Sequence, residues 1–315
     1  MKASFLPSDD IITSLSLLDT NDPIDYQGIR WFSMFGTTRS TSRASRSIGI
    51  HPNLSDGDIE RALKKYPSRK KLKKSAHRFD FTSFFKDLEP KCGHYQLHHN
   101  LFCQSYHDLY YLGQNDCVNS FCTIRKKKKS YPNANLNPTC LAVSKNLYAL
   151  GGHEGNIELF NLKNSDSIYH GTITEDGGAH ITNHVAFSDD DGSSLNLLVS
   201  SNDCTLKIFD LANGLTNPIF KFSKSTAINF AKVSPFKPLI ATYSDQREPE
   251  IIDKRSSEVV MSLKGHEDYG FCVDWHPIDE NIIASGNQDA TTRIWDLRNP
   301  KVILNKYTFL LCHSN

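Results

Sequence analysis

The stretch Gly265–Arg298 reads GHEDYGFCVDWHPIDENIIASGNQDATTRIWDLR, and it decides the fold class. Three short apolar runs within it predict β-strands, over Phe271–Trp275, Ile282–Gly286 and Thr292–Leu297. The polar residues Asn287-Gln288-Asp289 predict a tight turn between the second run and the third. The stretch therefore predicts an antiparallel sheet of short strands.

Both the first and the third run recur along the chain. Residues in a similar sequence context precede Trp295 at intervals of about 43 residues. They are Ile252, Phe209, Phe160 and, more weakly, Phe121. The first run recurs over Cys140–Val143, His184–Phe187, Phe230–Val233 and Cys272–Trp275. A period near 43 residues, with a Gly-His opening and a Trp-Asp close, is typical of four-stranded propeller blades. Pro249 falls in the third-strand position of one repeat, where it predicts a distorted or edge-like strand.

These features make the chain resemble the WD-repeat (WD40) proteins, whose fold is an all-β propeller. In the repeat that matches fully, the resemblance implies a structural tetrad made of His266, Ser285, Asp289 and Trp295. An indole N–H, a hydroxyl, an imidazole and a buried carboxylate can satisfy one another inside one blade. A catalytic Ser/His/Asp triad is the competing interpretation, and we prefer the tetrad because it accounts for the spacing of all four residues.

Four segments are also similar to a poorly characterised group of WD-repeat proteins in fungi and plants: Asp25–Trp31, Gln96–Leu112, Gly265–Pro277 and Gly286–Asn299. That group has no settled activity, so this resemblance supports the fold and leaves the function open. Members of the group carry further blades after the last segment, whereas the tail here is long enough for one outer strand. We therefore expect about five recognisable blades in an incomplete ring that self-associates, or a chain shortened at its C-terminus.

The front of the chain differs from the repeats in charge and pattern. Lys and Arg outnumber the acids by 21 to 13 over residues 1–130, whereas the acids outnumber Lys and Arg by 22 to 15 over residues 131–315. We expect residues 1–95 to form an irregular, partly disordered basic leader and residues 96–315 to form the blades.

Two basic runs lie in this front part. The candidate nuclear signal consists of Arg69, Lys70, Lys71, Lys73 and Lys74. The second run, Arg125–Lys129, lies between two expected strands, so we expect it on a loop. Contact with nucleic acid or anionic lipid and an ordinary solvated charged surface are the alternatives. No motif that enters a nucleic-acid groove accompanies either run, so sequence-specific nucleic-acid binding is not expected.

Composition restricts the class of protein. An apolar content of 38% and a charged content of 23% fit a globular chain and exclude a collagen-like or wholly disordered one. No apolar stretch reaches the roughly 18–20 residues of a membrane-spanning helix, and the start MKASFLPSDD lacks the apolar core of a secretory signal. Eight cysteines without a CxxC pair indicate a reduced protein of the cytoplasm, the nucleus or both.

Nothing in the sequence predicts a catalytic or metal centre. The chain contains no P-loop, dinucleotide fingerprint, nucleophile elbow or HExxH motif. Six potential metal ligands crowd into sixteen residues without an established zinc spacing: Cys92, His94, His98, His99, Cys103 and His107. We therefore expect no enzyme activity, no cofactor and no metal.

The predicted function is that of a protein–protein interaction scaffold, with partners whose identity the sequence does not give. The alternative is a substrate receptor of a cullin-RING ubiquitin ligase. Ile282–Arg298 resembles a box found in such receptors, and the resemblance implies that Arg298 would contact the ligase adaptor. Thr292 departs from the aliphatic residue usual in that box.

Overall fold

The computed structural model describes residues 25–26, 29–30, 85, 88–91, 99–114, 116–131, 136–144, 146–174, 178–189, 194–289, 291–300 and 303–308. It divides into one compact unit over Thr82–Tyr307 and a second that combines Met1–Phe81 with Thr308–Asn315. In the second unit, β1 (Asp25–Tyr26) and β2 (Ile29–Arg30) pair antiparallel, which places a short hairpin within the segment DYQGIRW.

Twenty further strands form five antiparallel sheets, here called blades 1 to 5, and each strand pairs with its neighbours in chain order. Blade 1 contains β3 (Leu101–Cys103), β4 (Asp108–Leu112), β5 (Val118–Cys122) and β6 (Lys127–Ser130). Blade 2 contains β7 (Pro138–Val143), β8 (Leu147–Gly152), β9 (Asn156–Asn161) and β10 (Ser167–Thr172). Blade 3 contains β11 (Thr182–Ser188), β12 (Asn196–Ser201), β13 (Thr205–Asp210) and β14 (Phe220–Ser223). Blade 4 contains β15 (Ile228–Val233), β16 (Leu239–Ser244), β17 (Glu250–Asp253) and β18 (Glu258–Ser262), and blade 5 contains β19 (Gly270–Trp275), β20 (Ile282–Asn287), β21 (Thr291–Asp296) and β22 (Ile303–Thr308).

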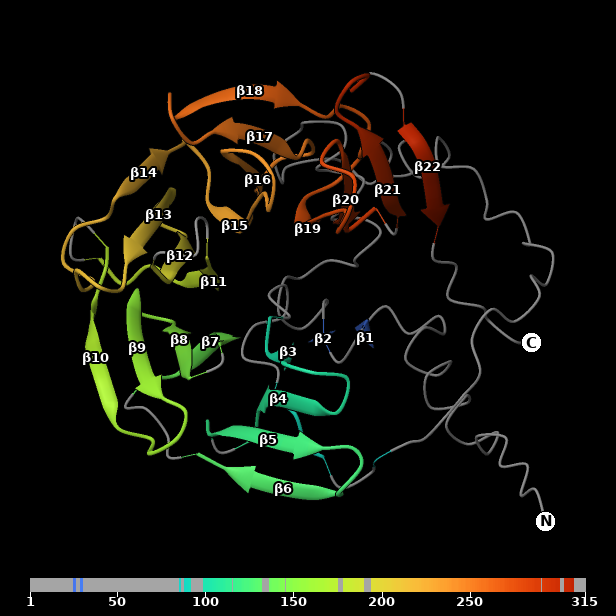
Figure 1. The fold of residues 1–315 in the computed structure, drawn as a ribbon. Coiled ribbons are helices and arrows are strands. Elements are labelled where there is room, and N and C mark those ends of the chain that lie inside the picture. The colour runs from blue at the N-terminus through green and yellow to red at the C-terminus, as the bar shows by residue number, and fades with distance from the viewer. Residues whose placement is uncertain are drawn as a thin grey trace, which may run out of the picture. The chain divides into compact units, whose positions relative to one another are not determined.

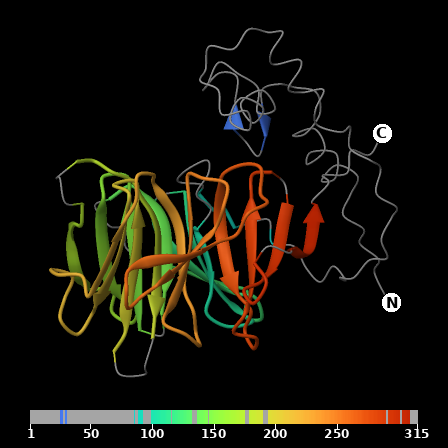
Figure 2. The same ribbon diagram turned by 90° about the horizontal axis from the view of Figure 1, so that it is seen from above.

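The blades follow one another around a centre, with the first strand of each blade innermost and the fourth outermost (Figure 1). Seen edge-on, the blades stand side by side with their strands running along the central axis (Figure 2). This arrangement confirms the predicted all-β propeller with five blades. The tail after Arg298 supplies the outer strand β22, as expected.

The repeat found in the sequence corresponds to one position in every blade. Phe121, Phe160, Phe209, Ile252 and Trp295 all lie on the third strand and are all buried. Even blade 1, whose sequence match is the weakest, has four strands. Pro249 lies directly before β17, which is two residues shorter than β13 or β21, because proline has no N–H to donate to the sheet.

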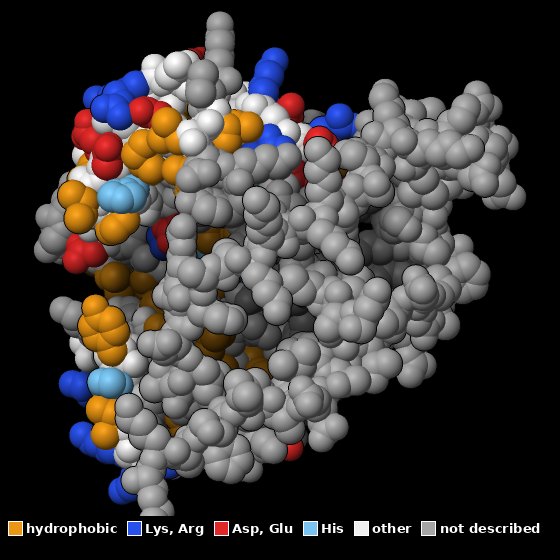
Figure 3. Space-filling view, turned by 90° about the vertical axis from the view of Figure 1, so that its right-hand side faces the viewer, with side chains coloured by type: hydrophobic (Ala, Val, Ile, Leu, Met, Phe, Trp, Pro, Cys, Tyr) orange, Lys and Arg blue, Asp and Glu red, His pale blue; other side chains and the backbone are white. Residues whose placement is uncertain are grey.

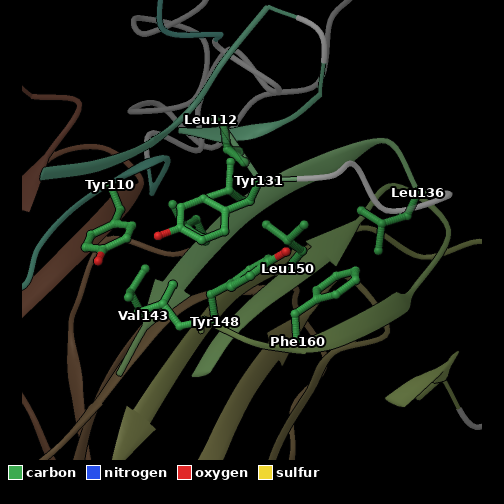
Figure 4. Close-up of a cluster of buried hydrophobic side chains, with 11 residues drawn as sticks. Tyr110, Leu112, Tyr131, Leu136, Val143, Tyr148, Leu150 and Phe160 are labelled. Atoms are coloured by element: carbon green, nitrogen blue, oxygen red, sulfur yellow. The ribbon is translucent and has the colours of Figure 1, made fainter. Parts of the chain in front are cut away.

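Apolar side chains pack between successive blades. Between blades 1 and 2, Tyr110 and Tyr131 lie against Val143, Tyr148 and Phe160 (Figure 4). The Tyr148 and Phe160 rings stack with their centroids 4.8 Å apart and their planes 13° apart. Burial at about 25 cal/mol per Å² of apolar surface makes such clusters the main source of stability in a fold of this kind.

A second contact between blades arises from a bulge near the start of the inner strands. The pairing register shifts at this point in β7, β11 and β15, and the bulged residue turns its side chain towards the next blade. Thr139, Asn183 and Asn229 each donate a hydrogen bond to a carbonyl of the next inner strand, namely those of Thr182, Ile228 and Gly270. The three distances are 2.5, 2.9 and 3.3 Å.

Blade 5 interrupts this series. Its bulge residue is Phe271, whose side chain has no donor. The described residues form four hydrophobic clusters, which join blades 1 and 2, 2 and 3, 3 and 4, and 4 and 5, and none of these clusters joins blade 5 to blade 1. One link there is made by His99 Nε2, which lies 3.2 Å from the Phe271 carbonyl oxygen. Described hydrophobic side chains reach the surface on this side of the molecule (Figure 3).

The outward faces of the two end blades carry apolar groups. On blade 1, Leu101 is 61% exposed, while the Phe121 ring is covered edge-on by Phe85 at a centroid distance of 4.9 Å. On blade 5, Cys272 is exposed although the matching Cys140 of blade 2 is fully buried. The blades at the two ends therefore present less completely covered faces than the blades between them.

The basic run at Arg125–Lys129 is not a loop, contrary to the expectation from sequence. Only Thr123–Lys126 forms a turn, and Lys127–Lys129 belong to β6. The strand forms because Lys128 pairs with Phe121 of β5 despite the low strand propensity of lysine. The predicted boundary between leader and blades at residues 95/96 stays a prediction.

Candidate functional site

The four residues of the expected tetrad lie together inside blade 5. Trp295 Nε1 donates to Ser285 Oγ at 2.8 Å, and Ser285 Oγ lies 2.8 Å from His266 Nε2. His266 Nδ1 in turn lies 2.8 Å from a carboxylate oxygen of Asp289. Because the carboxylate only accepts, Nδ1 carries the proton, and the Ser285 hydroxyl donates to Nε2. A single chain of hydrogen bonds thus runs from the third strand to the turn before it.

Asp289 is the centre of further contacts in that turn. It accepts hydrogen bonds from the N–H of Glu267 and from both the N–H and the hydroxyl of Thr291. Arg293 adds a cation 3.5 Å away. Burial alone would raise the pKa of Asp289, but the hydrogen bonds from His266 and Thr291 lower it to about 2.

Burial excludes nucleophilic catalysis by this Ser-His-Asp chain. The distances would suit a catalytic triad, but Ser285 is 1% exposed and His266 is 4% exposed. The Ser285 hydroxyl is also engaged by the Trp295 indole, so no reacting carbonyl can approach it. The geometry therefore suits a role in holding β20, β21 and the turns of the blade together.

A cavity of about 320 Å³ lies at the centre of the propeller, between the inner strands. Blade 1 contributes Leu101 and Phe102, blade 2 the stretch 141–143, blade 3 the stretch 184–188, and blade 4 the stretch 230–233 through Phe230, Lys232 and Val233. The wall is mostly apolar. Its polar groups are few, which is the composition usual for pockets that bind apolar groups in one orientation.

Three rings gather on one side of this cavity. His184 and Phe230 have centroids 4.0 Å apart, and His99 lies 4.8 Å from His184 and 4.5 Å from Phe230. Burial, followed by the nearby His99 and Lys232, lowers the pKa of His184 well below its usual value, so the ring is neutral at pH 7.

Two buried polar atoms of the cavity wall have no hydrogen-bond partner in the described part of the chain. They are His184 Nδ1 and Ser188 Oγ. The two residues lie four apart on the regularly paired part of β11, hence about 13 Å apart along the strand, which is too far for a Ser-His pair to act as nucleophile and base. These two residues therefore do not form a catalytic pair.

The remaining sequence candidates lie elsewhere. Arg298 lies at the surface with its side chain 63% exposed, and its guanidinium donates to both carboxylate oxygens of Asp296, at 2.8 and 2.6 Å. The candidate nuclear signal of Arg69, Lys70, Lys71, Lys73 and Lys74 lies outside the described residues. So do three members of the Cys/His cluster, Cys92, His94 and His98.

Of the rest of that cluster, His99 lines the cavity, Cys103 is exposed, and His107 contacts the Thr123 hydroxyl. The part of the chain that the structure describes contains no cluster of three metal-ligating side chains. Among those same residues, no helix has the length and apolar character needed to cross a membrane.

Apart from His99, the cavity residues were not among the sequence candidates, although a signal for one of them existed. His184 occupies the repeat position filled by Cys140, Phe230 and Cys272 in other blades. Because the first strand of each repeat forms the hub of a propeller, a histidine at this position indicates a polar group near the centre.

A family model described as "WD domain, G-beta repeat" matches residues 257–296, which comprise β18 to β21. The matched region contains all four tetrad residues. It is one repeat among the five that the structure shows.

Curated relatives match over longer stretches. The chain is 34% identical over 103 residues to the ribosome biogenesis protein ytm1 of Pyrenophora tritici-repentis, covering 32% of this chain and 22% of that protein. It is 35% identical over 112 residues to YTM1 of Pyricularia oryzae, covering 34% and 23%. It is 27% identical over 151 residues to histone acetyltransferase type B subunit 2 of Candida glabrata, covering 47% and 35%.

The matched stretches thus span about a fifth to a third of the length of these relatives. The bladed fold, the buried tetrad and the matched repeat agree with one another. This chain is a WD40-repeat β-propeller protein with distant homology to the ribosome biogenesis proteins YTM1 and WDR12.

Proposed function

We propose that this chain is a non-catalytic scaffold that binds a partner protein at its central cavity. The partner would place there an apolar side chain carrying one hydrogen-bonding group. The observation that carries the proposal is the mostly apolar cavity of about 320 Å³ with two unpaired buried polar atoms. An unpaired polar atom costs about 1–3 kcal/mol when buried, so a partner whose binding shifts the wall enough to reach one of these atoms gains affinity and orientation together.

The relatives support a place in a larger assembly. Two are named as ribosome biogenesis proteins and one as a subunit of a histone acetyltransferase. We extend to this chain the role of a protein-binding subunit in the cytoplasm or nucleus. None of these names refers to a ubiquitin ligase, so the receptor function through Arg298 gains no support from them.

His184→Phe tests the role of the cavity. Phenylalanine retains an aromatic ring beside Phe230 and removes the unpaired nitrogen, so stability should be unchanged or higher. The tagged wild type and the variant would be purified from cells with their partners and compared by quantitative mass spectrometry. We expect at least one protein to be enriched with the wild type and reduced about tenfold or more with the variant.

Ile278→Ala is the matched control, because Ile278 is an apolar side chain that is 83% exposed and away from the cavity wall. It should retain every protein that the wild type recovers. Recovery of the same proteins in the same amounts with His184→Phe would show that the cavity is not the binding site.

A further inference from the structure

The outer edge of blade 1 is the most strongly basic surface among the described elements. Arg125 and Lys126 lie in the turn before β6, and Lys127, Lys128 and Lys129 fill three of its four positions. All five side chains belong to exposed residues. The edge therefore presents five consecutive cations to solvent.

In the described part of the chain, none of these five cations is paired with an acid. Lys129 lies over the Tyr131 ring, 4.3 Å from its centroid, which leaves the positive charge in place. The acid in the same cross-strand row, Asp108, is two strands away and accepts from Ser105 at 2.8 Å.

Protection of a free strand edge does not explain this charge. Lysines on edge strands oppose unwanted pairing with other chains, and the outer strand of every blade has such an edge. The other outer strands carry little charge: β10 reads SIYHGT, β14 reads FKFS and β18 reads EVVMS. Those three strands have at most one ionised residue each, so protection of an edge does not require a run of lysines. The run on β6 therefore points to a ligand.

We propose that β6 and the turn before it bind the phosphate backbone of a nucleic acid without reading its sequence. Successive residues of an antiparallel strand rise about 3.4 Å, so Lys127, Lys128 and Lys129 form a row of charge along the strand edge. Side chains alternate between the two sides of the strand edge, with Lys128 opposite Phe121 and Lys129 opposite Ser120. This splayed arrangement suits a continuous polyanion better than a single pocketed carboxylate or phosphate.

Lysine also fits this ligand chemically. Its ammonium group is a point charge that contacts phosphates without the fixed fork of arginine, so it favours binding that does not depend on sequence.

The test compares two triple variants of the full chain. Lys127→Gln/Lys128→Gln/Lys129→Gln removes three charges from β6, and Lys163→Gln/Lys221→Gln/Lys264→Gln removes three exposed charges from other blades. Binding of a fluorescent oligouridylate and of an oligothymidylate of equal length would be measured by anisotropy at several salt concentrations, after thermal melts show that each variant is folded.

We expect the β6 variant to bind about tenfold or more weakly and to lose about 2 from the slope of log K against log salt, since each contact contributes about 0.7 for single strands. The control should stay within about threefold of the wild type. The RNA and DNA probes then show which source of phosphate is preferred.

Three outcomes would overturn the proposal. One is equal loss in both triple variants, which would assign binding to net charge. Another is no loss in the β6 variant, which would place any binding elsewhere, for example in the basic leader. The third is selective β6-dependent binding to a polyglutamate peptide or to phosphatidylserine vesicles without binding to either oligonucleotide. Partner recovery in the His184→Phe experiment is independent of all three.

Discussion

Blades 3 and 5 contain the same turn but stabilise it differently. In blade 5, Asp289 accepts from Thr291 and is followed by Arg293 at 3.5 Å. In blade 3, Asp203 accepts from Thr205 at 2.6 Å and is followed by Lys207, also at 3.5 Å.

The two blades differ in what lies above that turn. Blade 5 adds His266, Ser285 and Trp295, whereas the registers place Val199 and Phe209 of blade 3 at the positions of Ser285 and Trp295. One carboxylate oxygen of Asp203 consequently has no hydrogen-bond partner among the described residues. The turn and the apolar packing therefore suffice to form a blade, and the tetrad adds further hydrogen bonds to them.

Removal of the tetrad's aromatic side chain should destabilise the protein most. Trp295→Ala should lower the free energy of unfolding by about 3–5 kcal/mol, because it leaves a cavity in the core and removes the donor to Ser285. Phe209→Ala in blade 3 should lower the free energy of unfolding by less, since the Phe209 ring forms no hydrogen bond whose partner would be left unpaired. Chemical denaturation of both variants checks the order, and equal losses would break the distinction between the blades.

A double variant tests whether Ser285 and Trp295 stabilise blade 5 jointly. Ser285→Val/Trp295→Phe gives blade 5 the residues of blade 3. We expect it to cost less than the sum of the two single changes, because the hydrogen-bonding partners are removed together. Additive losses measured by denaturation would show that the two side chains are not coupled.

The next effect concerns the acid of the turn. Asp289→Ala should cost about 1–3 kcal/mol, because the His266 imidazole and the Thr291 hydroxyl lose their acceptor. Asp203→Ala should cost less, since no imidazole donates to Asp203 in the described part of blade 3. A larger loss for Asp203→Ala in urea denaturation would contradict this account.

Acid titration isolates the charge of Asp289. Its folded-state pKa of about 2 lies below the ordinary value of 3.8, so its stabilisation is complete above about pH 4 and disappears as pH falls through about 2. The difference in unfolding free energy between wild type and Asp289→Asn should therefore shrink by about 2 kcal/mol or less over that range. A constant difference between pH 5 and pH 2.5 would show that the charge contributes nothing.

The smallest effect is expected at Arg298. Blade 3 has Ala212 at the matching position, and the N–H of each residue donates to the preceding aspartate at 2.9 or 3.0 Å. Arg298→Ala should therefore leave the unfolding midpoint unchanged, because the turn needs only the backbone donor. If a cullin adaptor were recovered with the wild type and lost with this variant, the ubiquitin-ligase alternative would gain the support that it now lacks.

The sequence predicted those features that depend on local spacing. The third-strand positions from Phe121 to Trp295 and the tetrad residues could be located because strand alternation and the turn at Asn287–Asp289 fix which side chains share a face. Pro249 predicted a distorted or edge-like strand, and the structure shows a β17 that begins only after this proline.

Other features could not be read from spacing. The cavity depends on how four blades are placed around one centre, so no single repeat contains it. Lys127–Lys129 were assigned to a loop because their own propensity opposes a strand, and only pairing with Phe121 and its neighbours on β5 overcomes it. The absence of a bridging donor at Phe271 could not be predicted either, because the sequence does not show that Thr139, Asn183 and Asn229 donate hydrogen bonds to the next blade.

Among the described residues, four hydrophobic clusters join the five blades, and this number determines where the molecule should begin to unfold. In a linear array each inner unit gains free energy from two neighbours and each terminal unit from one, so local unfolding starts at the ends. Amide protons of β3–β6 and β19–β22 should then exchange with solvent faster than those of β11–β13. In blade 5 the hydrogen bonds of the tetrad compensate in part for the missing neighbour, because they form within one blade.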